Sequence, residues 1–573
     1  MKKFCDITTR NELADFLGVP RNKLTYILYI KKVDSYYSSF EIPKKSGGVR
    51  KINAPKDDLK YIQKRLADAL WEYQVYIWKK YKINPNISHG FEKHKGIITN
   101  ARIHRNRRYL LNIDLEDFFN SFHFGRVRGF FEKNRNFSLP NEVAVVIAQL
   151  SCFEGTLPQG APTSPIITNM MCQILDNRLL KIAKSYKLNY TRYADDLTFS
   201  TNNKEFEKNQ HDFLTALKKE IERAGFKLND KKTRLQFRDY RQTVTGLVVN
   251  KKLNVNQTYC RVTKSMAHAL YSKGEFIIDG SQGTLAQLEG RFSFINQLDW
   301  YNNKLENKKR DSMNFKRDFM NFNGREREYR RFLFYKYFFN NSMPVIVTEG
   351  KTDVRYIKAA LKNLYKEYPR LISKDEDGNF QFKLYFLRKS KKLRYFFGIQ
   401  LYGGDTIQQI YQYFIDGTEK EKIKFPNYYE YFCKMGSKPK APVCFLFDNE
   451  INSQRPLKKF INKNKIEENK IQLLRDNLHL KLKEDGNVYL LTNPLVDNKD
   501  ECEIENLFLE ETIKHKIDGK ELCLKDQYDI KKYYGKEIFS KYIFSNYESI
   551  EFSRFRPLLN AIDSVLISYA QSE

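Results

Sequence analysis

The distribution of apolar and polar positions changes near residue 340. Before that point short apolar strands alternate with longer helices, and residues 256–340 are helical and basic. Beyond it, apolar strands end in acidic residues and glycine, the pattern expected at the carboxyl edge of a parallel α/β sheet. In the first part, strands are predicted within residues 40–55, 109–113 and 189–200, and helices over residues 57–78, 166–185 and 205–224.

Two adjacent carboxylates, Asp195 and Asp196, lie between β-prone segments, which predicts a hairpin whose turn holds both acids. Neighbouring like charges are unfavourable when buried, so such a pair is usually solvated or neutralised by a divalent cation. A metal site needs a further carboxylate, and Asp114, at the end of the strand predicted at residues 109–113, is the candidate. Asp114 alone is more simply explained as a cap, so the metal prediction depends on all three acids together. Because adjacent strand residues point to opposite faces, Asp195 is expected to ligate more directly than Asp196.

The composition indicates several domains and a polyanionic partner. At 573 residues the chain exceeds what one hydrophobic core usually supports. The formal charge is +31, from 100 Lys and Arg against 69 Asp and Glu, and the chain also carries 37 Tyr and 43 Phe. Basic and aromatic residues together favour nucleic acid over a membrane surface as the partner. The alternative is a lysine-rich solvated surface without a specific partner.

The cysteines and the apolar runs indicate a cytoplasmic protein. Eight cysteines are scattered, without a Cys-x-x-Cys pair or a histidine at zinc-ligand spacing, as expected of reduced thiols. No stretch approaches the roughly 20 apolar residues of a membrane-spanning helix, and the N-terminus leads into no signal-type apolar core. We therefore expect a cytoplasmic location and no membrane association.

Basic and glycine-containing loops accompany the acids. The hairpin predicted within residues 40–55 carries Arg50 beside a basic turn, which suits a triphosphate or a nucleic-acid backbone, although an ordinary exposed hairpin explains it too. Residues 157–165 form a rigid Pro and Gly loop in which Gln159 can hydrogen-bond a sugar or a base. Lys232 is expected near the acidic hairpin.

Residues 10–255 resemble the fingers and palm of reverse transcriptases. The matching motifs are, in order, Ile113-Asp114 with Phe118-Phe119, Pro158-Gln159-Gly160 with Ser164-Pro165, and Tyr193-Ala194-Asp195-Asp196. Two further blocks resemble signature blocks of retron reverse transcriptases, namely Asn100-Ala101 with His104, and Val244-Thr245-Gly246. A polymerase of the group II intron or diversity-generating type is the alternative, and both retron-type blocks argue against it.

The resemblance implies a polymerase that copies a structured non-coding RNA from the 2′-hydroxyl of an internal guanosine and leaves a branched RNA-DNA (msDNA). It also implies deoxynucleoside triphosphates as substrates and two Mg²⁺ ions held by Asp114, Asp195 and Asp196. By the family pattern, the other functional residues are Phe119 under the sugar, Gln159 at the incoming nucleotide, Arg50 at its phosphates, Lys232 at the leaving group, and Asn100, His104, Val244, Thr245 and Gly246 in RNA binding. No ribonuclease H domain is recognised, so removal of the copied template implies a host ribonuclease H.

The second part of the chain carries a separate set of acids at predicted strand ends. Glu349 follows the apolar strand that begins at residue 344, and Asp448 and Glu450 follow a second strand about a hundred residues later. Asp448 and Glu450 are two residues apart, so in an extended segment both project to one side and can share a cation. Residues 401–406 predict a third strand end with a Gly turn.

Residues 343–510 resemble Toprim domains, which occur in topoisomerases, primases and a class of nucleases. On that resemblance Glu349 is the acid/base group, and Asp448 with Glu450 is the metal pair for one or two Mg²⁺ ions. Asp353 and Glu505 are further candidates for the same site. The family more often has Asp where Glu450 stands, which shifts the metal by about one bond. Because no tyrosine domain of a topoisomerase is evident, hydrolysis of RNA or DNA is expected.

The sequence therefore predicts a multidomain protein of α/β and α+β class. Right-hand polymerase fingers and palm are expected in residues 1–255, a helical thumb and linker in residues 256–340, and a Rossmann-like Toprim domain with a C-terminal extension in residues 341–573. The preferred function is a retron polymerase fused to a Toprim nuclease. The branched RNA-DNA made by the polymerase restrains the nuclease, and the nuclease acts as an anti-phage effector. The alternative is a C-terminal half that anchors nucleic acid without cutting. The oligomeric state stays open, a homo-oligomer included.

Overall fold

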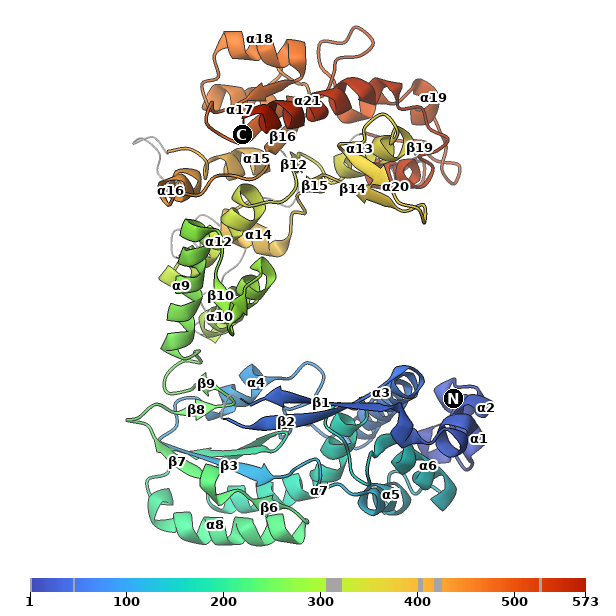
Figure 1. The fold of residues 1–573 in the computed structure, drawn as a ribbon, viewed down its shortest axis with the longest axis vertical. Coiled ribbons are helices and arrows are strands. Elements are labelled where there is room, and N and C mark those ends of the chain that lie inside the picture. Colours follow the sequence, from blue (N-terminus) through green and yellow to red (C-terminus); the bar gives the residue numbers. More distant parts are fainter. Residues whose placement is uncertain are drawn as a thin grey trace. The chain divides into compact units, whose positions relative to one another are not determined.

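The computed structural model describes residues 3–44, 47–305, 322–399, 405–416, 425–524 and 528–572. The chain forms two compact units, Met1–Gln257 and Thr258–Glu573, which are described separately (Figure 1). Most of the strand end predicted at residues 401–406 lies outside the described residues. Within the described ranges, no helix is both long and apolar enough to cross a bilayer.

The first unit is built around a sheet in which β3 (Tyr109–Glu116) is the central strand. It pairs in antiparallel fashion with β5 (Asp196–Thr201) on one side, and with β6 (Lys227–Leu228) and β7 (Arg234–Phe237) on the other. The strand β4 (Asn189–Tyr193) continues the sheet beyond β5. Within β3 only Glu116 is exposed, as expected of a strand with neighbours on both sides.

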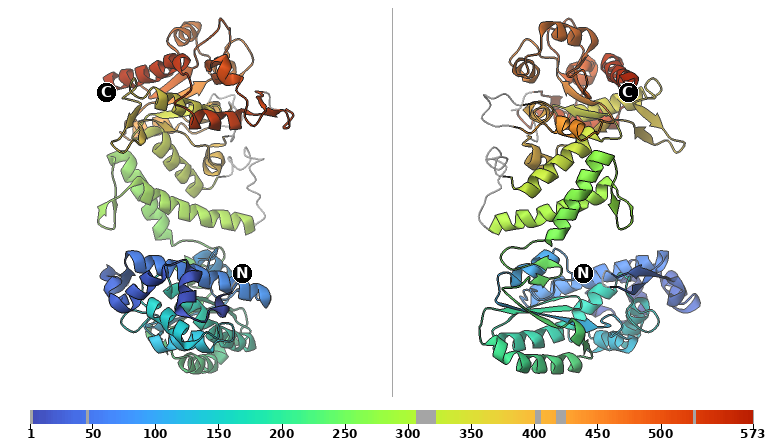
Figure 2. Two further views of the ribbon diagram at one scale, coloured as in Figure 1. Left: turned by 90° about the vertical axis from the view of Figure 1, so that its right-hand side faces the viewer. Right: turned by 60° about the vertical axis from the view of Figure 1, so that its left-hand side comes forward.

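Helices cover one face of this sheet (Figures 1 and 2). In α8 (Phe206–Arg223) the buried residues Phe206, Phe213, Leu217 and Ile221 form one stripe, and the helix ends before Gly225, whose φ is 77°. The helix predicted over residues 205–224 is therefore confirmed. The other main elements of this unit are α1 (Arg10–Leu17), α2 (Arg21–Thr25), β1 (Tyr37–Pro43), β2 (Val49–Pro55), α3 (Asp57–Lys80), α4 (Ile97–Ala101), α5 (Phe124–Lys133), α6 (Asn141–Ser151), α7 (Ser164–Ser185), β8 (Thr243–Val244) and β9 (Leu247–Val248).

The second unit contains a five-stranded sheet of order β15-β12-β16-β18-β17. Its parallel strands are β12 (Val345–Thr348), β15 (Tyr385–Phe386), β16 (Val443–Phe447) and β18 (Val488–Thr492), and the edge strand β17 (His479–Lys481) is antiparallel. The strands β12, β16 and β18 are buried along their whole length, as parallel strands covered on both faces should be. The parallel sheet predicted beyond residue 340 is therefore present.

Successive residues of these strands enter two different hydrophobic cores, because side chains alternate across a sheet. Val345 and Val347 pack in the first core, and Ile346 packs in the second. The first core also takes in residues of α9 (Gln257–Lys273), α10 (Leu285–Leu305) and α12 (Gly324–Phe334), and the second takes in residues of α13 (Asp353–Asn363), α20 (Lys536–Ser545) and α21 (Arg556–Ser572). The domain boundary predicted near residue 340 therefore falls inside a shared core.

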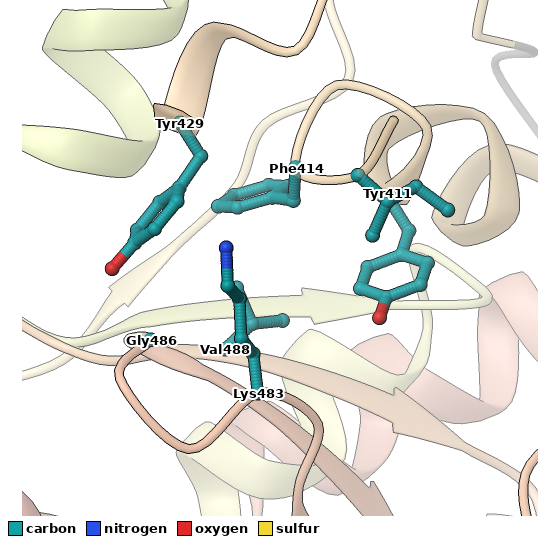
Figure 3. Close-up of a pocket in the computed structure, with 7 residues that line it drawn as sticks. Tyr411, Phe414, Tyr429, Lys483, Gly486 and Val488 are labelled. Carbon is teal, nitrogen blue, oxygen red and sulfur yellow. The ribbon is translucent and has the colours of Figure 1, made fainter. Parts of the chain in front are cut away.

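A small cavity lies near the amino end of β18, between aromatic side chains and Lys483 (Figure 3). Its volume is about 10 Å³, room for about one water molecule. The Lys483 ammonium lies 4.9 Å from the ring centre of Tyr429, a cation–π distance. The cavity is too small for a nucleotide and lies at the opposite end of the strands from the predicted acids, so it is not a candidate substrate site.

Candidate functional site

The structure brings the three predicted polymerase acids together on the sheet of the first unit. Antiparallel pairing of β3 with β5 places Asp114 directly opposite Asp196. Asp195 lies in the two-residue turn between β4 and β5, where Tyr193 pairs with Asp196. The Leu115 amide donates a hydrogen bond of 3.1 Å to the Asp195 carbonyl, which ties this turn to the central strand. The predicted hairpin is confirmed, but its turn holds only Asp195, because Asp196 pairs with Tyr193 as the first residue of β5.

Burial and mutual repulsion raise the pKa of two of these acids, while nearby cations oppose the shift. The Lys232 ammonium donates to both carboxylate oxygens of Asp114, at 2.9 and 3.0 Å. Desolvation, followed by the charges of Asp195 and Asp114, raises the pKa of Asp196 to about 7. Desolvation and the charge of Asp114 also raise the pKa of Asp195.

A donor set made of carboxylates alone fits Mg²⁺. In the part of the chain that the structure describes, however, no three His, Cys, Asp or Glu side chains converge closely enough to hold a metal ion as they stand. At the polymerase acids, Lys232 holds the carboxylate of Asp114. The metal roles predicted for Asp114, Asp195 and Asp196 therefore stay predictions that the charge and the ligand type support.

A cavity of about 390 Å³ opens beside Asp114 and Asp196. Thr245 and Gly246, predicted to bind RNA, line it together with Lys232. Their turn between β8 and β9 is held against the central strand, because the side-chain amide of Asn112 donates to the Thr243 carbonyl at 2.8 Å. The predicted RNA-binding turn therefore lies beside the acids, whereas the side chain of its first residue, Val244, is buried.

Two of the residues predicted to bind the nucleotide, Arg50 and Gln159, lie on the β1–β2 hairpin and on the Pro-Gly loop, which are hydrogen-bonded to each other. The Asn53 amide at the end of β2 donates to the Gln159 carbonyl at 2.8 Å, which ties the hairpin that carries Arg50 to this loop. Arg50 is close enough to Asp195 for its charge to favour the ionised form of that acid. Phe119 follows β3, and its ring centre lies 6.0 Å from that of Phe91. The nucleotide-binding roles of Arg50, Gln159, Phe119 and Lys232 stay predictions.

Asn100 and His104 are buried against the β4–β5 hairpin and do not lie at a surface. Both have 0% of their area exposed. The His104 ring nitrogens lie 2.8 Å from the Ser200 hydroxyl and 2.7 Å from the Thr191 hydroxyl, which itself donates to the Asn100 side-chain oxygen at 2.5 Å. These two residues therefore hold β4 and β5 in place. The RNA-binding role predicted for Asn100, His104 and Val244 stays a prediction, and the burial of all three side chains argues against direct contact with RNA.

Lowering the pH from 7 to 5 is expected to destabilise the first unit through His104. Burial, followed by the positive charge of Arg107, lowers the pKa of His104 to about 3. In the unfolded chain His104 binds a proton near pH 6.5, whereas in the folded unit it stays neutral down to about pH 3. The contribution of neutral His104 to the free energy of unfolding is therefore complete above pH 6.5 and is lost as the pH falls toward 3. The expected loss at pH 5 is about 2 kcal/mol.

The pH effect is measured by urea unfolding of the full chain at pH 7 and pH 5, followed through hydrogen exchange of peptides from the first unit. In the variant His104→Gln the difference between the two pH values should shrink by about 2 kcal/mol. A variant that keeps the full pH difference would contradict the assignment to His104.

A second group of acids lies at the carboxyl ends of the parallel strands in the second unit. Because β12 and β16 are adjacent, Glu349 and Asp448 meet there, and the Asp448 amide donates to the Glu349 carboxylate at 3.1 Å. Asn493 follows the next strand, β18, and donates to an oxygen of Asp448 at 2.8 Å. The Ile504 amide donates to the same oxygen at 2.9 Å. Sequence analysis missed Asn493, although its place directly after an apolar strand was a usable signal.

Burial and mutual repulsion dominate the charges at this second group. Burial, followed by the charges of Asp353 and Glu450, raises the pKa of Glu349 to about 8. Burial, followed by Asp353, Glu349 and Glu505, raises the pKa of Asp448. The charges of Asp353 and Glu505 therefore act on Asp448, and their place in one shared site stays a prediction. The set of donors again suits Mg²⁺, although in the described ranges it does not enclose an ion as it stands.

Cations border the second group at several of its acids, and the Lys536 ammonium donates to the Glu505 carboxylate at 3.2 Å. The Lys389 ammonium donates to the main-chain carbonyl of Glu349 at 2.6 Å, and burial lowers the pKa of this lysine to about 8. The Arg455 guanidinium lies 3.5 Å from the Glu450 carboxylate, and burial raises the pKa of Glu450. The sequence pattern alone did not place Lys389 at the acids. The predicted metal role of Glu450 stays a prediction.

Known proteins match this chain through its polymerase part. The sequence profile of the family described as reverse transcriptase (RNA-dependent DNA polymerase) matches residues 42–261. Retron Ec86 reverse transcriptase of Escherichia coli is 32% identical over 293 residues, which cover 50% of this chain and 85% of that protein. The chain belongs to the retron reverse transcriptases.

Two relatives in Myxococcus xanthus support the same assignment. The Mx162 and Mx65 retron reverse transcriptases are 33% and 34% identical over 328 and 318 residues. Each match covers 51% of this chain, and the chain spans 64% and 68% of the length of these two relatives. The matched profile of the reverse transcriptase family includes Asp114, Asp195 and Asp196 and ends before Glu349. The resemblance of the second unit to Toprim domains stays a prediction.

Proposed function

We propose that this chain is an RNA-directed DNA polymerase that copies a structured non-coding RNA from an internal 2′-hydroxyl into branched RNA-DNA. The observation that carries the proposal is the pairing of Asp114 with Asp196, beside the Asp195 turn, in a retron reverse transcriptase. Mg²⁺ bound to these acids would activate the primer hydroxyl and offset the charge of the leaving pyrophosphate.

The residues around the acids have matching tasks in this proposal. Arg50 binds the phosphates of the incoming nucleotide, and Gln159 hydrogen-bonds its sugar or base. Phe119 occupies the space of a ribose 2′-hydroxyl, which selects deoxynucleotides. Lys232, which neutralises Asp114 here, faces the leaving pyrophosphate once Asp114 binds a cation. Thr245 and Gly246 contact the cognate RNA beside the acids.

The test is a synthesis reaction with the purified chain, RNA transcribed from its native locus, deoxynucleoside triphosphates and Mg²⁺. We expect DNA covalently joined to RNA, released by an enzyme that cleaves 2′,5′ branches, with template removal only when a ribonuclease H is added. DNA that starts from a free 3′ end would contradict the retron reaction and favour the group II intron or diversity-generating type.

We further propose that the second unit is a Toprim-type Mg²⁺-dependent nuclease, located in the cytoplasm, that acts as an anti-phage effector and is restrained by the RNA-DNA product. Its support is the junction of Glu349 and Asp448 at adjacent strand ends, with Asp353 and Glu505 close by. In this proposal Asp448 and Glu450 hold the metal, Glu349 transfers protons, and RNA or DNA is hydrolysed. The alternative, a scaffold that binds the product without cutting, is favoured by the contact of Glu450 with Arg455.

Replacing Glu349 with Ala is expected to abolish the toxicity of the overproduced chain while DNA synthesis continues. The physical reason is that Glu349 belongs to the second unit and not to the polymerase acids. Growth of cells that overproduce wild type, Glu349→Ala and the control Glu376→Ala measures the effect, since Glu376 is an exposed acid of the same unit. Toxicity that persists in Glu349→Ala would contradict the effector proposal.

A further inference from the structure

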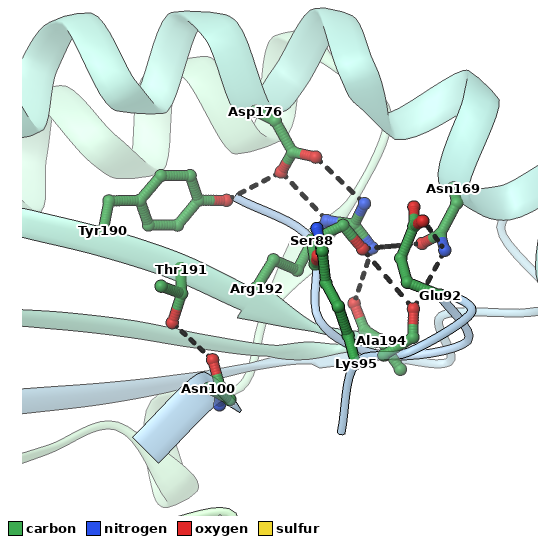
Figure 4. Close-up of polar contacts among 11 residues, drawn as sticks. Ser88, Glu92, Lys95, Asn100, Asn169, Asp176, Tyr190, Thr191, Arg192 and Ala194 are labelled. Atoms are coloured by element: carbon green, nitrogen blue, oxygen red, sulfur yellow. Dashed lines mark hydrogen bonds and ion pairs between the residues drawn. The ribbon is translucent and has the colours of Figure 1, made fainter. Parts of the chain in front are cut away.

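A buried guanidinium lies directly behind the turn that carries Asp195. Arg192, on β4, has 0% of its area exposed, and Figure 4 shows its side chain between α7 and the turn. It forms a two-bond ion pair with Asp176 of α7, with both distances 2.9 Å. A third nitrogen atom donates to the Asn169 side-chain oxygen and to the Ala194 carbonyl, each at 3.2 Å. One side chain thus connects helix α7 to the main chain of the turn.

The loop at residues 88–92 holds the same turn from another side. The His89 amide donates to the Arg192 carbonyl at 2.8 Å, and the Asn169 amide group donates to the Gly90 carbonyl at 2.9 Å. Gly90 is so close to the turn that a Cβ atom there would lie 2.6 Å from the Ala194 nitrogen. Any other residue at position 90 must therefore displace either the loop or the turn.

The turn needs such support because its conformation is unfavourable by itself. Ala194 has a φ of 58°, in the left-handed region that residues with a Cβ atom seldom adopt. Conformations of this kind persist where the surroundings fix them, and they are frequent at active sites. Here the surroundings are the guanidinium of Arg192 and the loop at Gly90.

We propose that Gly90, Asn169 and Arg192 are positioning residues, which fix the Ala194 turn so that the Asp195 carboxylate stays in reach of Asp114. This inference rests on the proposed polymerase function. Displacement of a reacting group by about 1 Å can cost about a hundredfold in rate, so a shifted turn should impair catalysis more than binding. A purely structural role would instead lower the stability of the unit and leave the kinetic constants of the folded fraction unchanged.

The test compares Gly90→Ala with Gly96→Ala in the full chain. Gly96 lies on the same segment, has an extended φ of 178°, and a Cβ atom there would meet nothing within 4 Å. In primer extension with Mg²⁺, we expect Gly90→Ala to lower kcat at least about tenfold with the nucleotide KM within about twofold. Gly96→Ala should match wild type.

A second variant and a second measurement keep the outcome decisive. Asn169→Ala removes the bonds to Arg192 and Gly90 without adding an atom, and we expect a smaller loss of kcat in the same direction. Hydrogen exchange of the peptide that contains Leu115, whose amide donates to the Asp195 carbonyl, should be faster in both variants than in Gly96→Ala. Unchanged exchange and unchanged kcat in both variants would overturn the positioning role. If the wild-type chain makes no DNA, the polymerase proposal fails. Hydrogen exchange of the Leu115 peptide then decides by itself whether Gly90, Asn169 and Arg192 fix the Ala194 turn.

Discussion

Replacing Asp195 with Asn is expected to lower the rate of DNA synthesis by about 10³-fold, equivalent to about 4 kcal/mol of transition-state stabilisation. The substitution keeps the size of the side chain but removes the charge that would hold Mg²⁺ opposite Asp114. Because the turn is held through main-chain atoms and Arg192, its position should survive the change. Primer extension measures the rate, and circular dichroism and binding of a fluorescent primer-template should stay at wild-type levels.

The matched control for this substitution is Asp117→Asn. Asp117 lies three residues after Asp114, is exposed, and has a φ of 43°, which Asn tolerates well. Its synthesis rate should equal that of wild type. Comparable losses in Asp117→Asn and Asp195→Asn would show that any reduction of acidic charge in this region lowers activity, and would remove the evidence for a specific metal ligand.

Replacing Asp176 with Ala is expected to destabilise the first unit by about 3–5 kcal/mol. Burial opposes the charge of Arg192, and Asp176 offsets this and raises the pKa of the guanidinium. A guanidinium keeps its proton in proteins because it is intrinsically so basic, so the charge remains when the partner is removed. An unpaired buried charge is the source of the loss, and Tyr190 also loses the oxygen to which its hydroxyl donates. Pulse proteolysis across a urea gradient, read on fragments of the first unit, measures the change.

Two further variants separate the charge from the shape of this site. Asp212→Ala removes an exposed acid of α8 and should change stability by less than about 0.5 kcal/mol. The double variant Arg192→Met with Asp176→Leu leaves no buried charge, so it should recover part of the lost stability. It should not recover DNA synthesis, because nothing then donates to the Ala194 carbonyl. A double variant no more stable than Asp176→Ala would contradict this account.

Local sequence patterns were sufficient to predict the acidic hairpin and the parallel strands of the second unit. Asp195 lies in a tight turn and Asp196 begins the strand that follows it, and the apolar strands that precede Glu349 and Asp448 leave both of these acids at one edge of a sheet. In each case the chemistry follows from residues next to one another in the chain, together with the general rule that parallel strands present their carboxyl ends at one edge.

The burial of residues by elements that are distant in the sequence could not be predicted in the same way. Asn100 and His104 are polar, and nothing adjacent to them in the chain shows that β4 and β5 cover them. The roles of Arg192 and Asp176 depend on the packing of a strand against a helix, which no short motif encodes. Lys389 likewise reaches Glu349 only through the arrangement of strands in the sheet, whereas Asn493 directly follows an apolar strand.

The core shared by the helices before residue 340 and the sheet beyond it determines where the chain can be shortened. Phe332, Phe334 and Phe338 are fully buried against that sheet and its helices. A fragment that stops at residue 340 leaves this aromatic surface in water, where it promotes aggregation. A soluble polymerase fragment must therefore end near Gln257, without the predicted thumb, or continue through the entire second unit. A folded thumb that binds nucleic acid can thus be retained only in a chain that also contains Glu349, Asp448 and the rest of the second group of acids.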